Sequence, residues 1–207
     1  MVETAEFWDK MAEKYSKSPI RDEKTYNEKL EVTRRYFNPD SKVFEFGCGT
    51  GTTAINHAPY VQYILATDIS TNMIAIAREK ASSANIGNVE FRAETLNECA
   101  QAKGSFDVVM AHNILHLIQD PQTAINTAYE LLKPGGAFVT STACLGEGLP
   151  HWRILLFLGK IFGKVPFVNV LKRKQLEQYF SNAGFELDLE WHRHKVSAFI
   201  ILKKPIA

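Results

Sequence analysis

The chain has 207 residues, 45% of them hydrophobic and 23% charged, and a formal net charge of +1. The composition is ordinary for a soluble globular protein, and the length fits one domain with a sizeable core. A nearly neutral net charge argues against a function that depends on binding the phosphate backbone of a nucleic acid, because proteins usually bind that backbone through a basic face. We therefore expect a single domain over 1–207 and no nucleic-acid partner.

The cysteines are odd in number and lack the spacing of metal ligands: Cys48, Cys99 and Cys144. A reducing, cytoplasmic setting is the simplest interpretation of that pattern. The first residues contain neither a basic region nor an apolar run, so the sequence predicts no signal peptide.

Residues 4–37 are predicted to form two helices that precede the first strand. Phe7, Met11 and Tyr15 recur every four residues, and Ser18-Pro19 then interrupts the pattern before a second helical segment.

A strand followed by a glycine-rich turn comes next. Val43, Phe44 and Phe46 are typical of a buried parallel strand. Glycines then stand at alternate positions: Gly47, Gly49 and Gly51. They allow a tight turn and the close approach of a ligand, and a helix beginning near Thr52 would direct free N–H groups at that ligand. The stretch predicts a nucleotide-type site at the carboxyl end of the first strand.

The glycine spacing distinguishes between the kinds of nucleotide that this site could bind. A dinucleotide fingerprint needs its third glycine one residue later, where Thr52 stands, and no lysine is placed for a phosphate-binding Walker loop. Asp68 ends a second apolar strand, 17 residues after Gly51. A carboxylate there can accept hydrogen bonds from both hydroxyls of a ribose.

Glu45 and the three glycines together resemble motif I of class I S-adenosylmethionine-dependent methyltransferases. The resemblance continues with 106–109 as the fourth strand and 131–136 before the fifth, in order and correctly spaced. It implies an α/β, Rossmann-like fold with helices on both faces of a seven-stranded, mostly parallel sheet, ordered 3-2-1-4-5-7-6 with strand seven antiparallel. It also implies S-adenosylmethionine as cofactor and S-adenosylhomocysteine as product.

The stretch from Phe7 to Tyr15 resembles the N-terminal cap of the ubiquinone and menaquinone biosynthesis methyltransferases. The resemblance implies that 1–37 is a helical cap and that Tyr15 and Tyr26 close over the methionine end of the cofactor. Packing of these aromatic side chains onto the core is the alternative.

The same resemblance assigns the remaining cofactor contacts. The loop residues are Gly47, Cys48, Gly49 and Gly51. Glu45 would face the methionine ammonium or else cap a helix, and Asp68 would bind the ribose. Ile69 and Met73 would lie beside the adenosine or in the core.

The adenine contact is left open. Relatives continue the third strand, here Asn88 to Glu94, with Gly-Asp-Ala, whose aspartate binds the adenine amino group. This chain has Glu94, Thr95 and Leu96 in that region, so Glu94 or Thr95 could replace the aspartate.

His112 follows the predicted fourth strand, Asp107 to Ala111, at the edge where open α/β sheets bind ligands. We expect it near the transferred methyl group, as a wall or as a base, with simple packing as the alternative. His112 and His116 stand four residues apart but have no third ligand, so no metal is predicted.

Residues 150–171 are strongly apolar, and Lys160 and Lys164 interrupt the run too soon for a membrane span. The segment lies where this family inserts structure that covers the substrate. A crossover helix in the core, a lid over the acceptor and a peripheral membrane contact all remain open. A helix over 173–184 and a strand pair, 185–191 and 196–202, complete the chain.

Methyl transfer to a small, partly apolar acceptor is the function that these observations favour. One rival is a protein or RNA methyltransferase, although the Asn/Asp-Pro-Pro motif of base methylators is replaced here by His112-Asn113-Ile114. The other rival is a non-catalytic S-adenosylmethionine-binding protein. The acceptor atom and the oligomeric state are left open.

Overall fold

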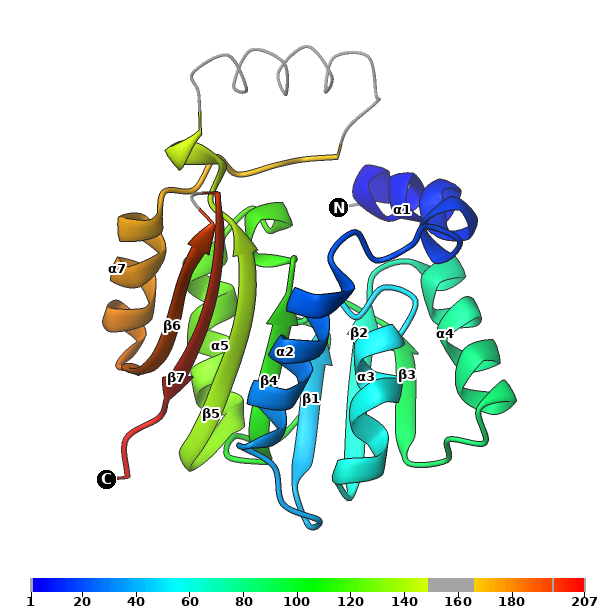
Figure 1. Cartoon of the computed structure of the whole chain (residues 1–207), viewed down its shortest axis with the longest axis horizontal. Coiled ribbons are helices and arrows are strands. Elements are labelled where there is room, and N and C mark those ends of the chain that lie inside the picture. Colours follow the sequence, from blue (N-terminus) through cyan, green and yellow to red (C-terminus); the bar gives the residue numbers. More distant parts are fainter. Residues whose placement is uncertain (1, 149–165, 195, 207) are drawn as a thin grey trace.

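A twisted sheet forms the centre of the molecule in the computed structural model, which describes residues 2–148, 166–194 and 196–206 (Figure 1). Its strands are β1 (Lys42–Phe46), β2 (Tyr63–Asp68), β3 (Val89–Ala93), β4 (Phe106–His112), β5 (Leu132–Ala143), β6 (Glu186–His194) and β7 (Ser197–Lys203). The seven strands are ordered β3-β2-β1-β4-β5-β7-β6, and β7 is antiparallel to both of its neighbours. The predicted fold and strand order are confirmed.

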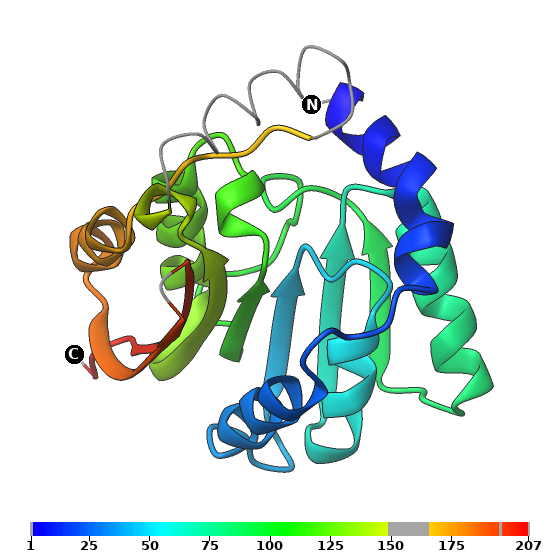
Figure 2. The same ribbon diagram turned by 45° about the horizontal axis from the view of Figure 1, so that its top comes forward.

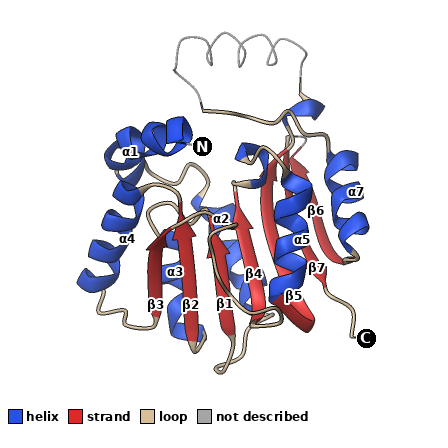
Figure 3. Ribbon diagram, turned by 180° about the vertical axis from the view of Figure 1, so that it is seen from behind, coloured by secondary structure: helices blue, strands red, loops and turns tan. Residues whose placement is uncertain are grey.

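Helices cover both faces of the sheet. They are α1 (Val2–Ser16), α2 (Glu23–Arg34), α3 (Thr52–His57), α4 (Thr71–Ser83), α5 (Pro121–Leu131) and α7 (Arg173–Ala183), with short turns η1 (Ala58–Tyr60), η2 (Leu115–Leu117) and η3 (Leu145–Glu147). The core on one face joins the sheet to α2, α3 and α4, and the core on the other joins it to α5 and α7. Figure 3 shows α5 and α7 on the second face.

The boundaries of several strands differ from the prediction, among them those of β4 and β5. β4 extends to His112, because His112 pairs in register with Ser141 on β5. β5 begins at Leu132 rather than after Gly136, because Leu132 already pairs with Phe106 before the register shifts. The Lys-Pro-Gly-Gly stretch was therefore wrongly predicted to lie outside the strand.

The N-terminal cap is fastened to α4. As predicted, the segment forms two helices, and Figure 2 shows α1 beside α4 near the carboxyl ends of the strands. Asp9 Oδ1 accepts hydrogen bonds from Ser70 Oγ at 2.6 Å and from the Asn72 N–H at 3.0 Å. Ser70 is also the N-cap of α4, where its side chain accepts a hydrogen bond from the Met73 N–H.

Most of the predicted lid, residues 150–165, lies outside the described residues. The part that is described, 166–171, is neither helix nor strand, and the Asn169 N–H donates to the His116 carbonyl at 2.7 Å. The roles considered for 150–171 therefore stay predictions. Within the described ranges, the structure contains no helix both long and apolar enough to cross a membrane.

Candidate active site

A cavity of about 290 Å³ lies at the carboxyl ends of β1, β4 and β5, beneath α2. The glycine loop, the end of α1 and the buried face of α2 surround it. Its lining comprises Tyr15, Ser16, Ile20, Tyr26, Lys29, Leu30, Thr33, Glu45, Gly47, Cys48, Gly49, Thr50, Thr52, Thr53, His57, Lys80, His112, Asn113 and Ser141.

The glycines of the loop have different tasks. Gly49 has φ +55° and lines the cavity, where a Cβ would lie 3.6 Å from the Tyr15 ring. Gly51 has φ +73° and is closed in, because a Cβ would lie 2.7 Å from the Phe91 ring and 2.8 Å from Ala77 Cβ. Gly49 therefore keeps space open for a ligand, whereas Gly51 lets α3 begin against α4 and β3. A cofactor contact at Gly51 stays a prediction.

Asp68 fixes the loop to the end of β2. Its Oδ2 accepts a hydrogen bond from the Gly49 N–H and its Oδ1 one from the Ser70 N–H, each at 2.9 Å. Burial raises the pKa of the carboxyl group, and these N–H donors partly offset that rise. The Ile69 N–H also acts on this carboxyl group, so backbone donors occupy part of its acceptor capacity. The ribose contact at Asp68 stays a prediction, and the residue does not line the cavity.

Glu45 is the buried acid of the cavity, with 2% of its surface exposed. The Ala54 N–H, in the first turn of α3, lowers the pKa of this carboxyl group, and a helix-capping role stays a prediction. Oε2 is buried and has no hydrogen-bond partner among the described residues. Burial first, and then the Asp68 charge, raise the pKa of Glu45 to about 8. An acid with one free buried oxygen fits a cationic amine brought by a ligand.

The variant Glu45→Gln tests that burial. The folded carboxyl has a pKa above its ordinary value of 4.5, so the folded protein binds the proton more tightly than the unfolded chain. The contribution of Glu45 to wild-type stability should fall as pH rises from 4.5 to about 8, whereas the amide does not titrate. Each pK unit corresponds to about 1.4 kcal/mol, or roughly 3–6 °C in a chain of this size. Thermal unfolding without cofactor should give a variant advantage that grows by about ten degrees or more over that interval. A constant difference would mean that Glu45 titrates normally.

The inner wall of the cavity joins β4, β5 and α2. His112 pairs with Ser141 on the neighbouring strand, and Lys29 Nζ donates to Ser141 Oγ at 3.2 Å. His112 Nε2 is buried and has no hydrogen-bond partner in the part of the chain that the structure describes. Burial first, and then the Lys29 charge, lower the pKa of His112 to about 4. Its imidazole is therefore neutral at neutral pH and able to accept a proton.

Two further residues of this wall were missed by the sequence reasoning. His57, at the end of α3, is fully buried, and neither ring nitrogen has a hydrogen-bond partner within the described ranges. Burial, together with His112, lowers the pKa of His57 to about 3. Asn113 follows β4 in the left-handed region, at φ +56°, and its N–H donates to the Ser141 carbonyl at 2.7 Å. Asparagine directly after a strand was the only available signal for such a turn.

The two tyrosines of the cap border the cavity. Tyr15 is 52% exposed at its rim, and the Tyr26 hydroxyl lies 3.3 Å from Thr53 Oγ1. Tyr15 is therefore not a core residue. Closure of both rings over the cofactor stays a prediction.

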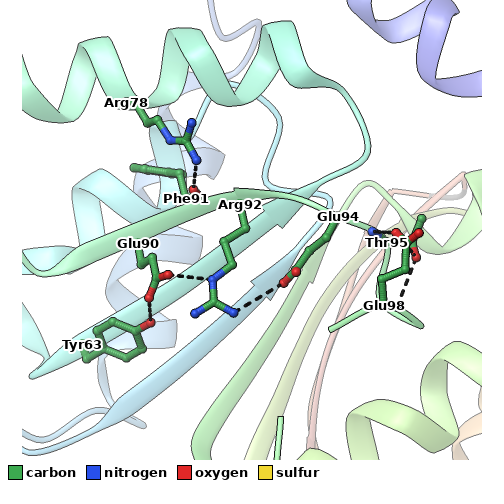
Figure 4. Close-up of polar contacts among 8 residues, drawn as sticks. All are labelled: Tyr63, Arg78, Glu90, Phe91, Arg92, Glu94, Thr95 and Glu98. Carbon is green, nitrogen blue, oxygen red and sulfur yellow. Dashed lines mark hydrogen bonds and ion pairs between the residues drawn. The ribbon is translucent and has the colours of Figure 1, made fainter. Parts of the chain in front are cut away.

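None of the residues of the adenine segment, 94–96, lines the cavity. Figure 4 shows Glu94 directed toward Arg92, and Thr95 beside Glu98. Thr95 is occupied locally, because its N–H and hydroxyl both donate to Glu98 Oε2 at 2.8 Å. Oε1 of Glu94 lies 4.0 Å from Nη1 of Arg92. This oxygen is buried and accepts no hydrogen bond from the described residues. Of the two candidates, Glu94 is the one with a free acceptor.

The remaining predicted contacts are packed or peripheral. Met73 is 2% exposed and Leu96 packs against the core, which is the packing alternative for Met73. Ile69 is half-buried, and none of the three lines the cavity. Cys48 does line it, and its thiol is buried with a strongly raised pKa. Their contacts with a cofactor stay predictions.

His112 and His116 do not form a metal site with other described residues. His112 ends a strand and His116 lies in η2, and no group of three or more His, Cys, Asp or Glu side chains suited to a metal occurs in the described part of the chain.

The fold and the cavity agree with the comparison to known families. The family described as "Methyltransferase domain" matches residues 37–184. The chain belongs to this family. The match covers every strand from β1 to β5 and the whole glycine loop.

The relatives of this chain include a separate methyltransferase and a part of a much larger synthase. A ubiquinone biosynthesis O-methyltransferase of Acinetobacter baumannii (strain ACICU) is 33% identical over 102 residues, which cover 49% of this chain and 43% of the relative. Highly reducing polyketide synthase 40 of Fusarium mangiferae is 27% identical over 94% of this chain, a stretch that is 8% of the synthase. The chain thus matches less than half the length of these relatives. A solved S-adenosylmethionine-dependent methyltransferase from Methanosarcina mazei superposes with a TM-score of 0.70 at 20% identity, covering 85% of this chain and 98% of that one.

S-adenosylmethionine is the methyl donor that the sequence predicts, and solved proteins with this fold are named S-adenosylmethionine-dependent methyltransferases. The residues present fit that cofactor: Gly49 leaves space where a Cβ would stand, and Glu45 has a free buried oxygen. Bound, the sulfonium supplies an already activated methyl group, so that positioning and exclusion of water provide most of the acceleration.

Proposed function

We propose that this methyltransferase acts on a small molecule that enters the cavity between α2 and the carboxyl ends of β4 and β5. The supporting observation is that the cavity continues past the glycine loop to His112, Asn113 and Ser141. Room beyond a cofactor loop is what an acceptor needs, and what a protein that only bound the cofactor would lack.

The names of two relatives support a small acceptor. One is the ubiquinone biosynthesis O-methyltransferase, and another, 25% identical over 178 residues, is phosphoethanolamine N-methyltransferase 1 of Arabidopsis thaliana. In our proposal, 1–207 forms one domain, α1 and α2 close the cofactor side, and Asp68, Glu45 and the loop at Gly49 hold the cofactor.

His112 is the proposed base for an acceptor that must lose a proton. Its Nε2 is buried and free, and its pKa of about 4 keeps the imidazole neutral. General bases contribute about 10²–10⁴-fold in rate. We expect His112→Gln to lower kcat by at least about 100-fold for a hydroxyl acceptor, with cofactor affinity unchanged within about threefold. An unchanged kcat would make His112 a wall of the pocket.

Methyl-labelled S-adenosylmethionine and a panel of small molecules test the proposal itself. The expected result is label in a small product together with an equal amount of S-adenosylhomocysteine. Label found only in protein or RNA would favour the macromolecular alternative. Cofactor binding without transfer to any acceptor class would favour a non-catalytic role.

A further inference from the structure

A lysine stands on the buried face of α2, next to the cavity. Its neighbours on that face, Leu30 and Thr33, are 5% and 1% exposed and also line the cavity. Lys29 is itself only partly exposed, and burial lowers the pKa of its ammonium group. Removing an ammonium from water without an opposite charge is unfavourable, so its position calls for a reason.

Among the described residues, the ammonium group of Lys29 has only neutral contacts. Nζ donates to Ser141 Oγ at 3.2 Å and lies 5.4 Å from the centroid of the Phe199 ring. In the described part of the chain no carboxylate forms an ion pair with Lys29, and Asp22 acts on it only as a more distant charge. An ammonium group has three donors, of which Ser141 takes one.

The other groups of the wall leave this charge uncompensated. Strand register places Ser141 between His112 on β4 and Phe199 on β7, so the three side chains form one row beneath α2. His112 is neutral at neutral pH, with a buried Nε2 that has no partner. Together with Lys29, the row therefore offers a cation and a hydroxyl beside a neutral imidazole at the end of the cavity. The ammonium and hydroxyl groups are hydrogen-bond donors, which suit an anionic oxygen.

We propose that Lys29 selects the methyl acceptor by pairing with its carboxylate, so that the acceptor is a small organic acid. The inference rests on the proposed function, because it names the class of molecule that enters the same cavity. A carboxylate would complete the contacts of the ammonium group. The matching neutral amide would leave the charge unpaired, and this difference is the source of selectivity.

The test uses the full chain saturated with S-adenosylhomocysteine. The probes are acetate, phenylacetate and benzoate, each paired with its neutral amide, and binding is followed by ligand-observed NMR titration. For at least one pair we expect the acid to bind about 10-fold more tightly than the amide. Lys29→Met should abolish that preference by weakening the acid alone, and Lys29→Arg should retain part of it.

Lys24→Met is the matched control, because it removes an exposed cation from the same helix. It should keep the full preference for the acid. S-Adenosylhomocysteine affinity, measured on each variant, reports whether the cofactor site is intact.

Either of two binding results would overturn the inference. One is that no acid in the series binds better than its amide, and the other is that the preference for the acid survives in Lys29→Met. Methyl transfer to neutral small molecules with Lys29→Met fully active would also contradict it, while leaving the proposed function in place. Absence of transfer to every small molecule, acidic or neutral, would remove the proposed function and this inference together.

Discussion

Gly49→Val is expected to abolish cofactor binding, with an affinity loss of more than about 100-fold, or about 2.7 kcal/mol. Gly49 has φ +55°, a region that a β-branched residue avoids, and its missing Cβ faces the cavity. The valine methyl groups would fill the space between the loop and Tyr15. Calorimetric titration of S-adenosylhomocysteine measures the loss.

Gly104→Val separates backbone strain from the loss of space. Gly104 has a similar φ of +68°, but a Cβ there would meet nothing within 4 Å. This variant should lose stability and keep its cofactor affinity. Gly49→Val with normal affinity, or with bound cofactor in a crystal, would show that the loop does not approach the cofactor.

Asp68→Ala should weaken cofactor binding by at least tenfold while the protein remains folded. Charge-assisted hydrogen bonds to the ribose hydroxyls would contribute roughly 1.5–3 kcal/mol each. The variant also loses the acceptor that holds the Gly49 and Ser70 N–H groups, so part of the effect acts through the loop. Asp68→Asn keeps one acceptor oxygen, so its cofactor affinity should lie between those of wild type and Asp68→Ala.

A cofactor analogue that lacks the ribose hydroxyls separates the two contributions. If Asp68 binds the ribose, wild type and Asp68→Ala should differ far less for the analogue than for S-adenosylhomocysteine. An equal loss for both ligands would assign Asp68 to loop positioning alone.

The fold could be predicted from local sequence patterns, and the packing of the strands and helices agrees with them. The glycine loop, the acid at Asp68 and the apolar strands each depend on residues close in sequence, and their order along the chain determines the sheet. Start and end positions were less certain, as at Leu132, because a bulge depends on pairing with a distant strand.

The acceptor side could not be predicted in the same way. Lys29 and Ser141 are 112 residues apart, and only the packing of α2 on β5 brings them together. Asp9 and Ser70 are 61 residues apart and meet because α1 lies on α4. A lysine between buried helix positions was a weak signal in the sequence, since a helix pattern does not say which strand the helix will cover.

A crystal structure with S-adenosylhomocysteine bound tests the central claim most directly, namely that the cavity beneath α2 joins the cofactor site to the acceptor chamber. We predict the methionine end of the ligand within the cavity, its amine near Glu45, its ribose hydroxyls on Asp68 and its sulfur facing His112 and Asn113. The space beside Lys29 and Ser141 should remain free for an acceptor. A ligand whose sulfur faces away from His112, or whose methionine end fills the space beside Lys29, would contradict the account.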